Sequence, residues 1–219
     1  MKLYLDTAET DAWDDLMPTG LFYGITTNPL LAARAGLSYP KIDWHSLAGK
    51  ARGHGAQELH AQLFGPVEGY VDWAGALYEA GRAEGIETVV KIPLIEAAIR
   101  KTAEIKSLGG RILMTACYDA KQMFVAQSLS AQYIAPYFGR MTEAGIDAKA
   151  HLSAMKDIQS SDEDGCQIMV ASLRAPEQMV ELAGLGMDVF TIAPGIAQAL
   201  MSEARSHAAY AEFEAAARK

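Results

Sequence analysis

Cysteine is scarce in this sequence, whose 219 residues include only Cys117 and Cys166. Two cysteines in separate apolar runs are too few for a disulfide framework, so we expect a reduced, cytoplasmic protein with both side chains filling the core. The absence of any run of about 18 apolar residues argues against a membrane-spanning helix. An acidic residue, Asp6, also precedes any stretch that could form the apolar region of a secretory signal.

Positive charge is in short supply as well. The 19 lysines and arginines face 27 aspartates and glutamates, which gives a formal net charge of −8. Without a dense basic run, the chain lacks the positive field that nucleic acids and anionic membranes require, so we expect neither as a partner. The five histidines show no metal-ligand spacing such as HExxH, and we expect no metal and no organic cofactor.

Apolar residues make up half of the chain and fall into alternating strand-like and helix-like runs. Short aliphatic runs typical of strands buried on both faces occupy residues 2–6, 22–26, 58–63, 88–92, 111–116, 133–136, 167–171 and 189–192. Amphipathic helical spacing follows most of these runs. Glycines such as Gly81 and Gly85 are expected to end the helices.

Eight such strand–helix units predict an α/β fold, a single (β/α)8 TIM barrel spanning residues 1–219 with a C-terminal helix at about 204–219. An open, doubly wound parallel sheet is the alternative architecture. It is disfavoured because no Gly-rich phosphate loop follows the first strand.

In such a barrel, chemistry takes place at the carboxyl ends of the strands. Seven of the predicted strands end on or near polar side chains, namely Asp6, Thr26 with Asn28, Gln62, Lys91, Thr115, Tyr137 with Arg140, and Ser172 with Arg174. Strand ends are often polar because they meet solvent, and this alone would explain any single one of these residues. The opposite strand ends show no comparable set, so we expect a single polar mouth.

Lys91 is the most informative of these residues because it lies inside the apolar run 88–94. A lysine in a buried strand is costly unless it is paired or neutral. Burial lowers the pKa of an amine and makes it a nucleophile toward carbonyl carbon. The alternatives are a side chain that reaches solvent at the strand end, or an ion pair with Asp6 across the barrel.

Six short motifs occur in order: LDTA at 5–8, GITTNP at 24–29, VVKIP at 89–93, TACY at 115–118, YIAPYFGR at 133–140 and ASLR at 171–174. As a set they resemble the transaldolase family, specifically its small members, which include the fructose-6-phosphate aldolases. The resemblance runs from residue 2 to about residue 200. It implies a single (β/α)8 barrel with a Schiff-base lysine on the fourth strand, the strand that carries Lys91.

The resemblance also implies the chemistry of these residues. Lys91 would attack the keto carbon of a ketose phosphate such as fructose 6-phosphate, and Asp6 would be the acid/base group for the C4 hydroxyl. Thr26 and Asn28 would orient the dihydroxyacetone portion, with Ala135 as a further substrate contact. The activity implied is cleavage or formation of the C3–C4 bond.

Two further sets follow from the resemblance. The residues implied to hold the catalytic water are Gln62, Thr115 and Tyr137. The residues implied to clamp the phosphate are Arg140, Ser172 and Arg174. The resemblance also implies a homo-oligomer, a pentamer or a decamer.

Three activities stay open. Gln62 and Tyr137 resemble the aldolase subgroup, whereas the larger transaldolases carry Glu and Phe there. The alternatives are a transaldolase that passes the three-carbon unit to an aldehyde, and a non-catalytic phosphosugar-binding barrel.

The chain also departs from the aldolase subgroup. Thr142 replaces the usual aspartate two residues after Arg140, Arg174 is the transaldolase residue, and the segment ending at Lys219 is shorter than the tail that crosses between subunits in decamers. These departures leave open the sugar, the choice of phosphate or sulfonate as its anionic group, and the subunit number.

Overall fold

The computed structural model describes residues 1–159 and 165–218. Each strand pairs in parallel with its neighbours along the chain, and β8 pairs with β1, so the sheet closes into a barrel. The strands are β1 (Lys2–Asp6), β2 (Gly24–Thr26), β3 (Glu58–Gln62), β4 (Glu87–Pro93), β5 (Arg111–Cys117), β6 (Tyr133–Pro136), β7 (Gln167–Val170) and β8 (Val189–Ile192). Their ends lie within two residues of the predicted ranges, and the (β/α)8 TIM barrel is confirmed.

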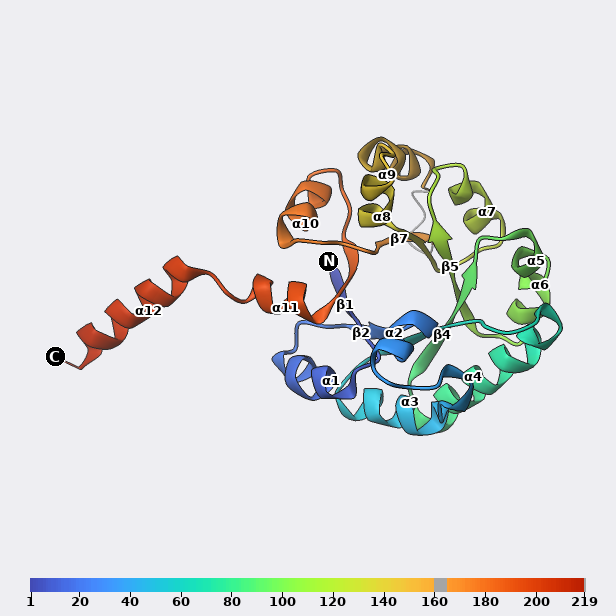
Figure 1. Ribbon diagram of the computed structural model, residues 1–219, viewed down its shortest axis with the longest axis horizontal. Coiled ribbons are helices and arrows are strands. Elements are labelled where there is room, and N and C mark those ends of the chain that lie inside the picture. The colour runs from blue at the N-terminus through green and yellow to red at the C-terminus, as the bar shows by residue number, and fades with distance from the viewer. Residues whose placement is uncertain (160–164, 219) are drawn as a thin grey trace.

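Helices form an outer ring around the barrel (Figure 1). They are α1 (Thr10–Leu16), α2 (Pro29–Arg34), α3 (Trp44–Gly53), α4 (Tyr70–Glu84), α5 (Glu96–Ile99), α6 (Thr102–Lys106), α7 (Gln122–Ser128), α8 (Phe138–Glu143), α9 (Ala148–Ile158), α10 (Pro176–Ala183), α11 (Pro194–Leu200) and α12 (Ala204–Ala217). Three 3₁₀ turns occupy Met17–Thr19, Tyr39–Lys41 and Val67–Gly69.

Two helices, not one, follow each of β2, β4, β6 and β8 among the described residues. α2 is an additional helix between β2 and α3, and in Figure 1 it lies inside the ring of outer helices. α12 matches the predicted C-terminal helix, although residue 219 lies outside the described residues. It extends away from the barrel, and none of its residues is buried.

Alternation along the strands divides the core into two regions. Residues such as Leu5, Ile92 and Phe190 point outward and pack against the helices in the larger cluster. Tyr4, next to Leu5 on β1, and Val89, three residues before Ile92 on β4, belong to a second cluster inside the barrel. Because both faces of each strand are covered, the strands appear in the sequence as continuous aliphatic runs.

Gly81 lies inside α4 and does not end it, contrary to the expectation from sequence. The helix ends at Glu84 and is capped by Gly85, whose φ of 69° is in the left-handed region that favours glycine. A Cβ atom at position 81 would lie 2.6 Å from the side chain of Thr88 and 2.8 Å from the carbonyl oxygen of Ile86. Gly81 therefore allows α4 to pack directly on β4, the strand that carries Lys91.

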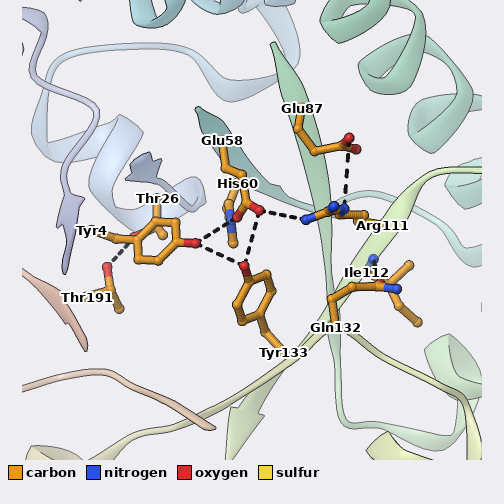
Figure 2. A network of polar contacts seen from close by, with 10 residues as sticks. All are labelled: Tyr4, Thr26, Glu58, His60, Glu87, Arg111, Ile112, Gln132, Tyr133 and Thr191. Atoms are coloured by element: carbon orange, nitrogen blue, oxygen red, sulfur yellow. Dashed lines mark hydrogen bonds and ion pairs between the residues drawn. The ribbon is translucent and has the colours of Figure 1, made fainter. Parts of the chain in front are cut away.

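The amino-terminal part of the barrel interior contains a polar network (Figure 2), here called the barrel floor and made of Tyr4, Glu58, His60, Arg111 and Tyr133. The Glu58 carboxylate accepts hydrogen bonds from Tyr4 Oη (2.8 Å), Tyr133 Oη (3.1 Å) and Arg111 Nη1 (2.9 Å), and His60 Nε2 lies 2.7 Å away. The expectation that these strand ends carry no comparable polar set is therefore wrong.

Charge in the barrel floor resides on Glu58 and Arg111. Burial alone would raise the pKa of Glu58, but hydrogen bonds from His60 and Tyr4 and the charge of Arg111 lower it to about 2. Burial lowers the pKa of His60 below its ordinary value, so the ring is neutral and donates through Nε2. The ionised carboxylate thus connects β1, β3, β5 and β6 through hydrogen bonds.

Candidate active site

The carboxyl ends of the strands surround a cavity of about 250 Å³. Ten of the eleven site residues predicted from the sequence line it, namely Asp6, Thr26, Asn28, Lys91, Thr115, Ala135, Tyr137, Arg140, Ser172 and Arg174. The closed barrel brings them together because its parallel strands all end at the same rim.

Lys91 is 5% exposed, and its Nζ donates a 2.9 Å hydrogen bond to the carbonyl oxygen of Thr27. It takes part in no ion pair among the described residues, so the alternative of a pair with Asp6 is not realised. Burial lowers the pKa of the Lys91 amine, and the charge of Asp6 opposes this shift. A buried amine of this kind is suited to attack a carbonyl carbon.

Asp6 and Thr26 are partners in the β1–β2 register at the cavity wall. Thr26 Oγ1 donates to Asp6 Oδ1 at 2.6 Å and lies 2.6 Å from Thr191 Oγ1 on β8. Because a hydroxyl group has one proton, Thr191 is the donor in the second hydrogen bond. This chain of hydrogen bonds fixes the orientation of the Asp6 carboxylate. The cavity-lining Thr191 was missed from the sequence, although its alternation on β8 marks it as inward-facing.

Asn28 is the N-cap of α2, followed by Pro29 at the first helical position. Its Oδ1 accepts a 3.0 Å hydrogen bond from the backbone N–H of Leu31. The cap therefore uses the oxygen of the side-chain amide and leaves its NH₂ group as a donor at the cavity wall.

Thr115 and Tyr137 form a hydrogen-bonded pair, with 2.8 Å between Oγ1 and Oη. The β5–β6 register shifts between Met114 and Cys117, and Ala116 adopts a φ of 57° within this irregularity. Burial raises the pKa of Tyr137, so its phenol remains protonated and can donate a proton or a hydrogen bond.

Gln62 is the predicted residue that does not line the cavity. It is the partner of Lys91 in the β3–β4 register. Its backbone N–H donates to Tyr39 Oη, and Tyr39 Oη donates to its carbonyl oxygen, both at 2.8 Å. Tyr39 therefore anchors the end of β3 beside the lysine strand.

Arg140, at the mouth, lies over the ring of Tyr137 with its Cζ 5.0 Å from the ring centroid. Ser172 has a φ of 63°, a conformation that is uncommon for a non-glycine residue and is found at functional sites. The backbone N–H of Gly139 donates a 3.0 Å hydrogen bond to the Ser172 carbonyl oxygen. A Cβ at Gly139 would lie 2.0 Å from that oxygen, so this contact requires glycine.

Arg174 also lines the cavity, but its guanidinium is bound by other groups. Its Nε and Nη2 donate to the two carboxylate oxygens of Glu143 at 2.7 and 3.2 Å. Its Nη1 donates to the carbonyl oxygens of Ser172 and Leu173 at 3.1 and 3.4 Å.

Arg34 is a cavity-lining residue that sequence reasoning missed. It lies at the end of α2, one turn after Leu30, and both side chains contribute to the cavity wall. A search for polar residues at strand ends does not find it, because it belongs to a helix. The only available signal is the i, i+4 spacing from Leu30.

Across residues 1–159 and 165–218, no three His, Cys, Asp or Glu side chains gather as a metal-binding group. No helix in this part of the chain is long and apolar enough to cross a membrane. Cys117 and Cys166 are buried free thiols, as expected, and burial raises the pKa of each to about 12.

Fold and site define a (β/α)8-barrel protein that presents an amine, an oriented carboxylate and arginines at one mouth. Comparison with protein families narrows this class. Residues 3–219 match the family described as Transaldolase/Fructose-6-phosphate aldolase. The chain belongs to this family, which confirms the resemblance seen in the motifs.

Curated relatives carry the name probable transaldolase. One from Phenylobacterium zucineum is 32% identical over 209 residues, covering 91% of this chain and 88% of the relative. Another, from Rhizorhabdus wittichii, is 29% identical over 207 residues, covering 92% and 89%.

Solved structures with the same fold are more distant. A mutant tryptophan synthase alpha-subunit from Pyrococcus furiosus aligns with a TM-score of 0.62 at 13% identity, covering 90% of this chain and 88% of that one. The structure described as native KDPGal aligns with a TM-score of 0.58 at 15% identity, covering 87% and 80%. At these identities the likeness concerns the barrel fold alone.

Proposed function

We propose that this protein is a Schiff-base aldolase that cleaves or forms the C3–C4 bond of a ketose phosphate such as fructose 6-phosphate. The products of cleavage are dihydroxyacetone and an aldose phosphate. Lys91 carries the proposal, because it is a buried amine on an apolar strand that faces a polar cavity. Covalent attack on a ketone requires such an amine, whereas binding a sugar phosphate does not. The proposal involves no metal and no organic cofactor.

The first step forms the Schiff base. The lone pair of the neutral Lys91 Nζ attacks C2, and the carbonyl oxygen becomes a hydroxyl group. One proton delivered to that hydroxyl allows it to leave as water, and an iminium cation remains. The Thr115–Tyr137 pair is the source of this proton, directly or through a water molecule. Gln62, the third water-holding residue that the resemblance implies, is the register partner of Lys91 but does not line the cavity.

The second step breaks the carbon–carbon bond. Asp6 accepts the proton of the C4 hydroxyl, the electrons of that O–H bond form the second bond of the aldose carbonyl, and the C3–C4 electrons move into the iminium to give an enamine. Asp6 then returns a proton to C3. Water adds to C2, one proton returns to the Thr115–Tyr137 pair, and Lys91 leaves as the free amine with dihydroxyacetone as the product. The hydrogen bond from Thr26 holds the carboxylate in place for both transfers.

The remaining residues bind and orient the sugar. The NH₂ group of Asn28 is a donor for the dihydroxyacetone portion, close to Ala135 on the cavity wall. The residues that the family resemblance implies for the distal phosphate are Arg140, Ser172 and Arg174. Of these, Arg174 already donates most of its N–H groups to Glu143 and to backbone carbonyl oxygens.

The test is product formation without an aldehyde acceptor. Fructose 6-phosphate should yield equal amounts of dihydroxyacetone and glyceraldehyde 3-phosphate, measured with coupled enzymes for each product. If neither fructose 6-phosphate nor any other ketose phosphate in a panel is cleaved, the aldolase proposal is wrong.

A transaldolase is the second candidate, and the names of the curated relatives favour it. In that case the three-carbon unit stays on Lys91 until an aldehyde acceptor arrives. Fructose 6-phosphate alone would then release no free dihydroxyacetone, whereas adding erythrose 4-phosphate would yield a new ketose phosphate.

Replacing Tyr137 with phenylalanine should shift the reaction from aldolase toward transaldolase. The variant loses the phenol that hydrogen-bonds Thr115, so release of the iminium by water should slow by about 10²-fold, the scale of a lost general acid or base. Transfer to an aldehyde does not consume water and should be less affected. The measurement is the ratio of free dihydroxyacetone to transfer product, with the exposed Tyr210→Phe as control. An unchanged ratio in Tyr137→Phe would contradict the proposed role.

The rate of Schiff-base formation should depend on pH through Lys91. Only the neutral amine attacks, so the rate of cyanoborohydride trapping with dihydroxyacetone should rise with pH and reach half its plateau below 10.5, the ordinary value for lysine. Because the charge of Asp6 raises the pKa of Lys91, Asp6→Asn should move that half-point to lower pH. A half-point at 10.5 or above, or an upward shift in Asp6→Asn, would argue against this account.

A further inference from the structure

A phosphate monoester carries a charge of about −1.5 to −2 at neutral pH, and its binding site needs matching positive charge. The cavity contains four basic side chains, namely Arg34, Lys91, Arg140 and Arg174. Lys91 must be neutral to react, so it contributes no charge to the binding of the anion before attack. The matching charge must therefore come from the arginines.

Arg174 is poorly placed to supply it. Glu143 balances its charge through two hydrogen bonds, and the carbonyl oxygens of Ser172 and Leu173 occupy its Nη1. Four of its five N–H groups are therefore committed to the protein. These contacts support the strained backbone at Ser172, and they leave Arg174 without a free fork for a phosphate.

Unlike that of Arg174, the side chain of Arg34 is not hydrogen-bonded to the rest of the described protein. It also takes part in no ion pair among the described residues, yet it lines the cavity with Arg140. It is held there by α2, the additional helix that lies inside the ring of outer helices in Figure 1. The α2 face that includes Leu30 and Arg34 forms part of the cavity wall. Arg34 also borders a second pocket beside Glu9 and Asp11, but it pairs with neither of them, so its guanidinium donors are not committed among the described residues.

We infer that Arg34 is the second guanidinium of the anion site, acting with Arg140, and that Arg174 mainly shapes the loop beside them. This inference rests on the proposed function, since it concerns the same cavity. Two guanidinium groups that form no ion pair among the described residues match a phosphate dianion better than a sulfonate, which carries a single negative charge. The substrate class is therefore a ketose that carries a phosphate monoester at the end distant from its keto group.

The test compares Arg34→Met with Arg34→Lys and with the control Arg52→Met, an exposed arginine on α3 outside the cavity. Binding is measured by calorimetry with glucitol 6-phosphate, which has no ketone and reports the anion site without the lysine chemistry. Arg34→Met should raise its Kd by about 10- to 100-fold, the loss expected for charge-assisted hydrogen bonds. Arg34→Lys should fall between the parent and Arg34→Met, and Arg52→Met should bind like the parent.

Two further readouts separate this role from a structural one. Borohydride trapping with dihydroxyacetone, which has no phosphate, should be equal in the parent and in Arg34→Met. The parent should also prefer fructose 6-phosphate over its 6-sulfonate analogue, and Arg34→Met should lose most of that preference. An unchanged Kd for glucitol 6-phosphate, or an equal loss of dihydroxyacetone trapping, would overturn the inference. Failure of the parent itself to form a dihydroxyacetone adduct would instead overturn the proposed function. The calorimetry would still test the role of Arg34, because binding of glucitol 6-phosphate does not depend on the lysine chemistry.

Discussion

Lys91→Met should reduce turnover of fructose 6-phosphate by a factor on the order of 10⁴ or more, the scale observed when an enzyme loses its nucleophile. Methionine is unbranched and apolar, so it suits the buried position on β4 and lacks only the amine. No iminium can form, and the electrons of the C3–C4 bond then have no acceptor. Steady-state release of dihydroxyacetone measures the effect.

Two controls accompany this variant. Lys101→Met removes a surface lysine that pairs with Glu104 and should be as active as the parent. Glucitol 6-phosphate should still bind to Lys91→Met, which shows that the cavity is intact. Full activity in Lys91→Met would contradict the mechanism. Tight phosphosugar binding in both proteins, with no turnover in the parent, would favour the non-catalytic barrel.

Glu58→Gln should lower the free energy of unfolding by about 3 kcal/mol. The Glu58 carboxylate accepts hydrogen bonds from both tyrosines and from Arg111, and it lies within hydrogen-bond distance of His60. Glutamine replaces one of its oxygens with an NH₂ group, so buried donors face another donor at a cost of about 1–3 kcal/mol each. The loss of charge also removes the partner of Arg111. Urea denaturation followed by circular dichroism measures the change.

The matched control is Glu96→Gln, which removes the same charge from an exposed pair with Arg100 on the surface. Such pairs contribute little, so the change there should stay within about 0.5 kcal/mol. Equal, small effects of both substitutions would contradict the role assigned to the barrel floor.

The same carboxylate makes stability depend on pH in a defined direction. The pKa of Glu58 is lowered from 4.5 to about 2, so the unfolded chain takes up the proton first as the pH falls. Its contribution is complete above about 4.5 and is lost as the pH approaches 2. Glu58→Gln lacks this titration, so the stability difference between the two proteins should shrink over that interval.

The architecture and most of the cavity lining could be predicted from the sequence because the barrel imposes strong regularities. Strands covered on both faces must be continuously apolar, so a lysine at position 91 within such a run is conspicuous. Closure of the sheet then brings all the carboxyl ends of the strands to one rim. Residues as distant in sequence as Asp6 and Ser172 therefore line a single cavity.

What could not be predicted depends on contacts between side chains that have no common sequence pattern. Tyr4, Glu58 and Tyr133 occupy inward positions of three strands, but nothing in the sequence shows that their polar groups meet. Arg174 forms an ion pair with Glu143, which is the last residue of α8 and lies 31 residues earlier in the chain. Arg34 reaches the cavity because α2 lies at the mouth, and this follows from the path of the chain after β2.

The most direct test of the central claim is chemical trapping at Lys91. The parent protein is incubated with dihydroxyacetone, reduced with borohydride, digested and analysed by mass spectrometry. The account predicts one stoichiometric adduct, located on Lys91 and absent from Lys91→Met. A protein that cleaves fructose 6-phosphate but carries no adduct, or carries it on another lysine, would contradict the account.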